Sequence, residues 1–281
     1  MKTILVPTEQ HDLMKSTLET ALLLARRFGG HVEGFALRQA LTDFLVADPY
    51  GGMAMDVVKK NEEEEAAQAR ALFESFMQQQ GVGVATEPTG AVSCHWAEEP
   101  GDNIIGSFGR AFDVIVLGRP GLEPGDPHKF TFETALFESG RPILLAPRVA
   151  PPVMGENILI SWNASTEQTR TTAFAMPLLK QAKRVTVLTV EDGPPQGPPG
   201  ELLARSLRFN DIPAKAATIP GKVKGGGGKA VGEATLAYAA SEGFDLLVKG
   251  ANTQSRLRQM IFGGATRQIL ENATLPVLMA H

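Results

Sequence analysis

The stretch "FDLLVKG", Phe244 to Gly250, has a near copy earlier in the chain, "FDVIVLG", Phe112 to Gly118. In both, aliphatic residues stand on successive positions without polar alternation, and a glycine follows. Runs of this kind are typical of strands that are buried on both faces of a parallel sheet. The two copies therefore predict buried parallel strands in equivalent places of two similar units.

Two further pairs of apolar runs occur in the same order. One pair is "TILVPTEQ" at Thr3–Gln10 and "NILISWNA" at Asn157–Ala164. The other is "RPILLAP" at Arg141–Pro147 and "LPVLMAH" at Leu275–His281. Three matched strands in one order indicate a duplication.

Helical patterns lie between these strands. Leu18, Leu22 and Ala25 recur at helical spacing before a Gly-Gly pair that would end the helix. In the second half, Ser165 stands where a helix cap is expected. Strands that alternate with helices form right-handed βαβ units, so each unit should be a parallel sheet with helices on both faces.

The chain has 281 residues, which suggests two domains of ordinary size. We expect the first domain at residues 1–148 and the second at 157–281. The segment 149–156 contains two adjacent prolines and is interpreted as the linker.

The first domain carries an insertion at about residues 38–60 that has no counterpart in the second. After it, Asn61 is expected to cap a helix whose first turn holds the acidic run Glu62–Glu65. Acidic residues at that place complement the helix dipole, so we interpret the run as a solvated helix start.

The composition limits the functions that are open to the chain. Hydrophobic residues make up 43% and charged residues 21%, with a formal net charge of -4. The absence of a basic field argues against nucleic acid or an anionic membrane as partner. The amino terminus lacks the apolar core of a signal peptide, and no run approaches the roughly 20 apolar residues of a membrane span. We therefore expect a cytoplasmic protein, and the single cysteine, Cys94, excludes an intrachain disulfide.

Motifs for catalysis are weak. The five histidines form no pair at metal-ligand spacing with each other or with Cys94, and no nucleophile elbow occurs, so no catalytic residue and no metal ligand is predicted. The segment "GKVKGGGGKAVGE" looks like a phosphate loop, but Ala230 stands where a hydroxyl residue should bind magnesium. We interpret Gly225–Gly228 as a flexible loop at a helix start, near the pocket.

The chain resembles the universal stress protein family in its tandem, two-domain form over nearly its whole length, most strongly over Asn157–Val190 and Phe244–His281 and least in the insertion of the first half. The resemblance implies two flavodoxin-like (Rossmann-like) α/β domains, each with a mostly parallel five-stranded sheet. It also implies ATP binding through a pattern of glycine, two residues, glycine, nine residues, glycine and then Ser or Thr. Glycines allow backbone N–H groups to surround phosphate oxygens, and a helix amino terminus adds its dipole.

Carried over to the second half, this pattern begins at Gly250 and places Thr253 at the second glycine. Gly263 follows after nine residues, and Gly264 replaces the hydroxyl residue. The hydroxyl groups of Ser255 and Thr266 and the guanidinium of Arg256 are the nearby groups that could contact phosphates, with Arg258 and Lys249 as further positive charges.

In the first half, Gly118 and Gly121 satisfy the opening of the pattern, but Thr131 and Phe132 replace its end. A phenylalanine there argues against a phosphate. The nucleotide is therefore expected in the second domain.

The acidic residue that the family places after the first strand, facing the base or ribose, becomes Asn163 in the second half and Glu9 in the first. Asn163 can both donate and accept hydrogen bonds. Val190 falls where the family contacts adenine through backbone groups, and Leu37 is its counterpart.

The resemblance thus implies a stress-response or regulatory protein that binds ATP, AMP or ADP with Mg²⁺ weakly, and at most hydrolyses ATP slowly. The alternative is a scaffold or small-ligand module that acts through contacts with an unknown protein partner. The last strands, Pro142–Ala146 and Pro276–Ala280, are expected to pair the two domains as an internal pseudo-dimer. A homodimer of such chains is a further expectation.

Overall fold

The computed structural model describes residues 1–37, 52–98, 104–121, 125–191, 197–221, 227–251 and 264–281. In the first half the elements are β1 (Thr3–Thr8), α1 (Met14–Phe28), β2 (His31–Ala36), α3 (Gly52–Gln79), β3 (Gly83–Val84), β4 (Ser93–Trp96), α4 (Ile104–Phe108), a 3-10 turn (Gly109–Ala111), β5 (Val114–Gly118), α5 (Lys129–Glu138) and β6 (Ile143–Ala146). In the second half they are β7 (Asn157–Ser161), α6 (Thr166–Leu179), β8 (Arg184–Glu191), α7 (Gly200–Arg208), β9 (Ala214–Pro220), α8 (Gly227–Ser241), β10 (Leu246–Val248), α9 (Gly264–Asn272) and β11 (Val277–Met279).

The strands form one continuous sheet of 11 strands in the order β3-β4-β2-β1-β5-β6-β11-β10-β7-β8-β9. Within the second half the order is therefore third, second, first, fourth, fifth, and all neighbours are parallel. The first half repeats this order and adds the two-residue strand β3 at its edge. The expected tandem α/β fold is confirmed, and its strand order is that of a Rossmann-like half.

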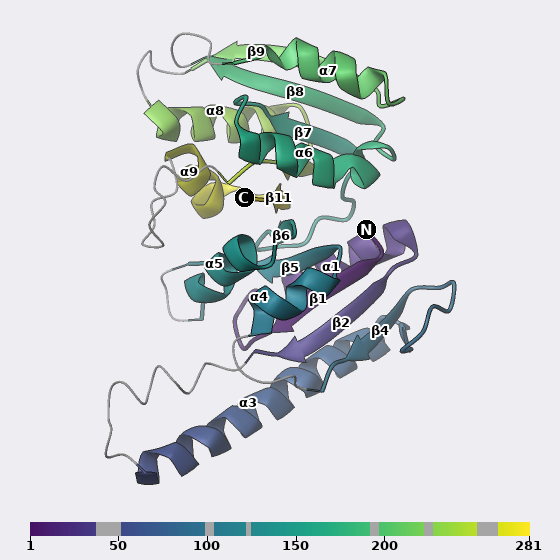
Figure 1. Cartoon of the computed structure of the whole chain (residues 1–281), viewed down its shortest axis with the longest axis vertical. Coiled ribbons are helices and arrows are strands. Elements are labelled where there is room, and N and C mark those ends of the chain that lie inside the picture. Colours follow the sequence, from purple (N-terminus) through teal and green to yellow (C-terminus); the bar gives the residue numbers. More distant parts are fainter. Residues whose placement is uncertain (38–51, 99–103, 122–124, 192–196, 222–226, 252–263) are drawn as a thin grey trace.

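The two halves are joined through their last strands (Figure 1). Strand β6 pairs antiparallel with β11, so that Leu145 lies opposite Val277, Leu144 opposite Leu278, and Ile143 opposite Met279. The predicted pairing of the two final strands within one chain is confirmed. It removes two sheet edges that would otherwise expose unpaired backbone groups.

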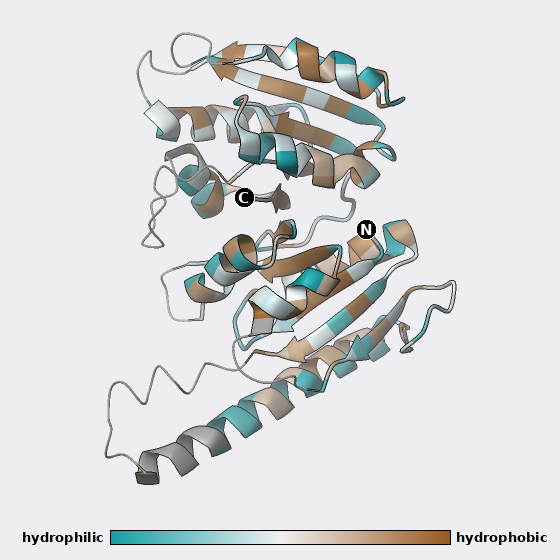
Figure 2. Ribbon diagram, viewed as in Figure 1, coloured by the Kyte–Doolittle hydropathy of each residue, from teal (hydrophilic) through white to brown (hydrophobic). Residues whose placement is uncertain are grey.

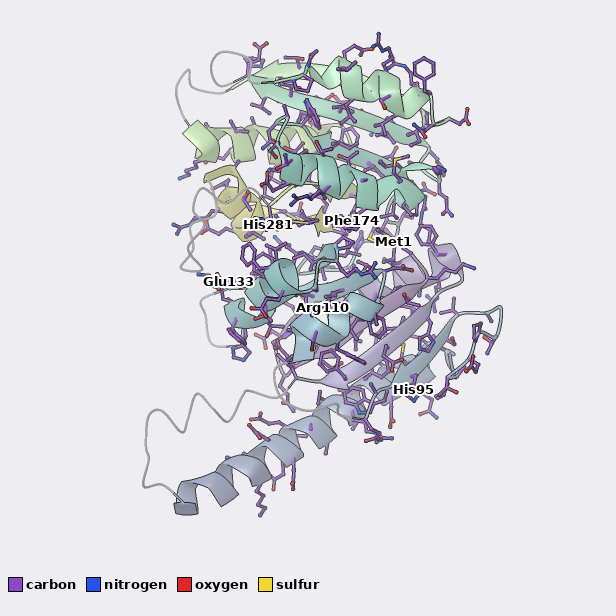
Figure 3. The ribbon with its side chains drawn as sticks, viewed as in Figure 1. Met1, His95, Arg110, Glu133, Phe174 and His281 are labelled. Carbon is purple, nitrogen blue, oxygen red and sulfur yellow. The ribbon has the colours of Figure 1, made fainter. Side chains whose placement is uncertain are left out.

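Helices cover both faces of the sheet, and its central strands are mostly apolar (Figure 2). One buried layer joins the sheet to α1, α3, α6 and α7, and the other joins it to α4, α5, α8 and α9. Both layers continue across the junction of the two halves, since Leu144 and Leu278 belong to the first, and Ile143, Leu145, Val277 and Met279 to the second.

The helix ends follow their local sequence. Helix α1 stops at Gly29, whose φ of 58° is left-handed and suits glycine. Ser165 caps α6 as predicted, because its hydroxyl accepts a hydrogen bond of 3.1 Å from the N–H of Gln168.

The prediction that Asn61 caps a helix is wrong. Asn61 lies inside α3, a helix of 28 residues whose amino-terminal part extends away from the sheet (Figure 1). The surrounding alanines, glutamates, lysines and glutamines are strong helix formers, so one asparagine costs only a few tenths of a kcal/mol. Lys60 and Glu64 add an ion pair of 3.9 Å one turn apart. Residues 38–51 of the insertion lie outside the described residues.

The repeated Phe-Asp pair has a structural role in each half. The carboxylate of Asp245 accepts hydrogen bonds from the backbone N–H groups of Gly155, Glu156 and Asn157 at 2.7, 3.1 and 3.0 Å. The carboxylate of Asp113 accepts two such bonds from the start of the chain, at Lys2 and Thr3. Asp113 thus fixes the beginning of β1 beside β5, and Asp245 fixes the beginning of β7 beside β10.

Among the described residues, no helix is both long enough and apolar enough to cross a membrane.

We predict that Asp245→Ala lowers the free energy of unfolding by roughly 2–3 kcal/mol, because it leaves three half-buried N–H groups without their acceptor. Urea denaturation measures this change. The matched variant Asp113→Ala should cost less, since the Asp113 side chain is 43% exposed and water can replace it. An equal or larger loss for Asp113→Ala would contradict this account of the repeat.

Candidate functional site

The candidate site lies where the strand order of the second half reverses. Strand β7 has β8 on one side and β10 on the other. Helix α6, which follows β7, and helix α9, which follows β10, lie on opposite faces of the sheet. In open parallel sheets, ligands bind outside the carboxyl ends of the strands at such a point. Here the carboxyl ends of β7 and β10 lead into Asn163 and Gly250, two of the predicted site residues.

Gly250 touches the amino-terminal turn of α6. Its N–H donates a bond of 2.7 Å to the side-chain oxygen of the fully buried Gln168. A Cβ atom at residue 250 would stand 2.4 Å from the backbone nitrogen of Gln168, far inside contact distance. Gly250 is therefore required by the close approach of α6 to β10, a role that the glycine pattern did not indicate.

Gly264 begins α9 and meets the first turn of α8. A Cβ atom on Gly264 would lie 2.9 Å from the backbone nitrogen of Lys229, and one on Gly228 would lie 2.8 Å from that of Ala265. The amino termini of the two helices are thus in backbone contact. A helix leaves the N–H groups of its first turn without partners inside the helix, so two sets of donors and two positive dipole ends converge here.

This contact also places the end of the glycine-rich segment. Gly227 and Gly228 form the start of α8, beside Gly264. Gly225 and Gly226 lie outside the described residues, and the expectation that this segment lies near a pocket stays a prediction. Sequence spacing could not show the contact, since the two glycines are far apart in the chain.

Val190 lies near the end of β8, beyond the point where β7 has stopped. The carbonyl of Leu188 faces β7, where it accepts a bond from Trp162, and the carbonyl of Glu191 faces β9, where it accepts one from Gly221. Backbone groups of a parallel strand point alternately to its two neighbours. The N–H and C=O of Val190 therefore face the crevice beyond the end of β7.

The other predicted site residues take different positions. Asn163 is exposed, and its side-chain oxygen accepts a bond of 3.2 Å from the N–H of Ser165 at the start of α6. Thr266 is 1% exposed in the first turn of α9. The structure thus brings Gly264 and Thr266 together on α9, with Gly250, Asn163 and Val190 at the neighbouring strand ends. Thr253, Ser255, Arg256 and Gly263, together with Arg258, lie outside the described residues.

Lys249 also belongs to this region, although the sequence indicated it only as a further positive charge near the loop. Its side chain is only 3% exposed, and its ammonium donates a bond of 2.7 Å to the carbonyl of Gly250. Burial lowers the pKa of Lys249 to about 8, against the opposing pull of Glu167. Alternation along the strand places Lys249 on the same face as Leu247, the face that α8 and α9 cover. The sequence feature that could have indicated Lys249 as a site residue is a lysine at the end of an apolar strand.

The equivalent crevice of the first half is filled by its own side chains. The carboxylate of Glu9 accepts hydrogen bonds from the hydroxyl of Thr131 and from the backbone N–H of His128, at the start of α5. Burial raises the pKa of Glu9, although these bonds oppose the shift. A Cβ atom on Gly118 would stand 2.6 Å from Pro127. A carboxylate of the protein thus occupies the helix start where a phosphate would have to bind.

The described residues contain no group of three or more His, Cys, Asp or Glu side chains that could hold a metal ion. Cys94 is buried, and burial raises the pKa of its thiol. His95 contacts the carboxylate of Glu33 at 3.0 Å. Neighbouring residues of a strand face opposite sides, so the thiol and the imidazole do not form a pair.

The model of the universal stress protein family matches residues 154–281. A universal stress protein from Archaeoglobus fulgidus superimposes with a TM-score of 0.69 at 14% identity, over 99% of this chain and 97% of that chain. A functionally unknown protein from Pseudomonas aeruginosa superimposes with a TM-score of 0.52 at 15% identity, over 100% and 92% of the two chains. At such identities the structural likeness shows the fold alone, and a search of curated proteins finds no match. The second half of the chain, residues 154–281, thus matches the universal stress protein family, and the first half repeats the fold in tandem.

Proposed function

We propose that the second domain binds an adenine nucleotide weakly, namely ATP, AMP or ADP with Mg²⁺, and that this binding regulates a universal stress protein-like role. The observation that carries the proposal is the meeting of the amino termini of α8 and α9 at Gly228 and Gly264. Converging helix starts offer backbone donors and positive dipole ends to an anion. Thr253, Ser255, Arg256 and Gly263, outside the described residues, belong to the proposed site through the family pattern.

Lys249 supports the same assignment. The ammonium is buried on the face that α8 and α9 cover, and Glu167 attracts it without an ion pair among the described residues. A buried charge that lacks a close ion-pair partner is costly, so a phosphate nearby would remove part of that cost. In this sequence Gly264 replaces the family's hydroxyl residue. Lys249 would attract the phosphate through its positive charge in place of a hydroxyl hydrogen bond.

The base has its own candidate partners. The N–H and C=O of Val190 face the crevice beyond β7, and one donor beside one acceptor matches the edge of adenine. Asn163, exposed at the same edge, would face the base or ribose through its amide. The first half lacks such a place because Glu9 and Pro127 fill its crevice.

We propose binding without dedicated catalysis. Hydrolysis would need a metal and an oriented water, and Gly264 provides no hydroxyl at the usual position. Slow hydrolysis is the most that this set of residues supports. Any Mg²⁺ would be held chiefly by the phosphates themselves.

A second function remains in competition, namely a scaffold or small-ligand module without nucleotide affinity that acts on a protein partner. The observation that favours it is that Gly250 and Gly264 are each required by helix packing. Both glycines would then persist without a phosphate. Absence of saturable heat when the nucleotide-free protein is titrated with millimolar ATP and Mg²⁺ would select this function.

We predict that Val190→Pro weakens ATP binding by roughly fivefold to tenfold in calorimetric titration, because it removes one N–H donor that faces the crevice. This N–H is not needed for pairing with β9, so the sheet should persist. Val190→Ala keeps the donor and serves as the matched control. Equal affinities for the two variants would exclude the Val190 backbone from the site.

We predict that the ATP affinity of the wild type falls as the pH rises through about 8, because the Lys249 ammonium loses its proton there. Lys249→Met should bind ATP roughly tenfold or more weakly at pH 7, without this pH dependence. Titrations at pH 6.5, 7.5 and 9 test both statements. A variant that binds like the wild type at every pH would remove Lys249 from the site.

The same substitution should stabilise the nucleotide-free protein. The folded pKa, about 8, lies below the ordinary value of 10.5, so the unfolded chain binds more protons between these values. The free energy of unfolding of the wild type therefore rises with pH between about 8 and 10.5. Below about 8 the buried ammonium destabilises the protein to its full extent. At pH 7, Lys249→Met should gain up to roughly 3 kcal/mol in urea denaturation. A loss of stability at pH 7 would contradict the burial of an uncompensated ammonium.

A further inference from the structure

Arg119 is a buried cation at the boundary of the two domains. It follows β5 in the first half, and its side chain is folded into the protein so that only 8% of the residue is exposed. One terminal nitrogen, Nη1, donates to the carbonyl of Ala273, directly after α9 of the second half. The guanidinium therefore faces the negative, carboxyl-terminal end of that helix.

The other two nitrogens of Arg119 have no such partner. Nε and Nη2 are both buried, and no described residue accepts a hydrogen bond from either. These two nitrogens form one edge of the planar guanidinium, and this edge binds two oxygens of a carboxylate or phosphate at once. The open edge thus has the geometry of an oxyanion receptor.

The charge of Arg119 is offset only by the partial negative charge at the end of α9. No carboxylate of the described residues forms an ion pair with Arg119. Burial lowers the pKa of Arg119 to about 10, and the like charge of Arg148 adds to this effect. Arg148 itself is 74% exposed and lies 3.7 Å from Asp126. A water molecule could satisfy the two N–H groups but would leave the buried charge without a counter-ion.

Two other arginines show how this edge is filled, wholly or in part, elsewhere in the chain. In Arg141 the same edge is satisfied, because Nε and Nη2 both donate to the carbonyl of Arg110 at 2.9 and 2.7 Å. In Arg27, Nη2 donates to the carbonyls of Gly155 and Gln181 at 2.9 and 2.7 Å, while Nε has no acceptor among the described residues. Among these three, Arg119 is the one whose edge has neither a carbonyl nor a carboxylate from the described residues.

We propose that Arg119, assisted by the charge of Arg148, binds a small oxyanion between the two domains, one that presents two oxygens to the Nε–Nη2 edge, such as inorganic phosphate. This site is separate from the proposed nucleotide site. It adjoins the carboxyl-terminal end of α9, whereas the nucleotide site adjoins the amino-terminal end, and a helix of 9 residues is about 13 Å long. Since Arg119 comes from one half and contacts the other, the anion would stabilise their junction.

The test is thermal unfolding of the full chain as inorganic phosphate is added at constant ionic strength, balanced with chloride. The wild type should gain roughly 2–4 °C in Tm once phosphate is well above its Kd, as expected for a ligand that binds only the folded state. Arg119→Met should show no gain. Arg141→Met, which removes an equal charge from a satisfied guanidinium, should respond like the wild type.

Further variants separate this site from the nucleotide site and guard against misfolding. Lys249→Met should keep the phosphate response, because it alters only the nucleotide region. If Arg119→Met does not fold, Arg119→Lys, which keeps the charge but lacks the planar edge, should show a smaller response than the wild type. Acetate in place of phosphate distinguishes the two sources of oxygen pairs, and a response to acetate alone would keep the site and assign it to carboxylates.

The proposal is overturned if Arg119→Met gains as much from phosphate as the wild type, or if neither anion changes the wild-type Tm beyond the effect of chloride. A gain that is lost in Lys249→Met and retained in Arg119→Met would also overturn it. That last pattern would place the phosphate in the second domain's crevice and would support the nucleotide site instead.

Discussion

The antiparallel pairing of β6 with β11 is the contact on which the rest of the molecule depends. It makes one sheet of two parallel halves and carries both buried layers across the junction through side chains such as Leu144 and Leu278. Because the pairing is antiparallel, the carboxyl end of β6 lies beside the amino end of β11. The residues that follow β5, one strand away, therefore come next to the turn between α9 and β11, and this is how Arg119 reaches Ala273.

The duplicated halves keep the same frame and have diverged at the strand ends. Asp113 and Asp245 fix equivalent strands in equivalent ways, and the strand order is the same. At the carboxyl edge the halves differ: the carboxylate of Glu9 accepts hydrogen bonds at the start of α5 in the first, whereas two helix starts meet without such a carboxylate from the described residues in the second. One fold thus carries an internally satisfied crevice and one suited to an external anion, and this asymmetry is the basis of the function that we propose.

The sequence was sufficient for features that depend on local patterns. Unalternated apolar runs predicted the buried strands, the matched order of those runs predicted the duplication, and the serine before a helical segment predicted the cap at Ser165. The prediction that Asn61 caps a helix was wrong because strong helix formers on both sides of it outweigh the preference of one asparagine for a cap position. The packing role of Gly250, the contact of Gly228 with Gly264, and the open edge of Arg119 could not be predicted, since each arises between segments that are distant in the chain.

The asymmetry between the two crevices is the central claim, and hydrogen exchange followed by mass spectrometry, with and without ATP and Mg²⁺, tests it most directly. Our account predicts slower exchange in the first turns of α8 and α9 and at the end of β8, with no change in residues 125–132 of the first half. Slower exchange around Glu9 and α5, or no change in either half at millimolar ATP, would contradict it.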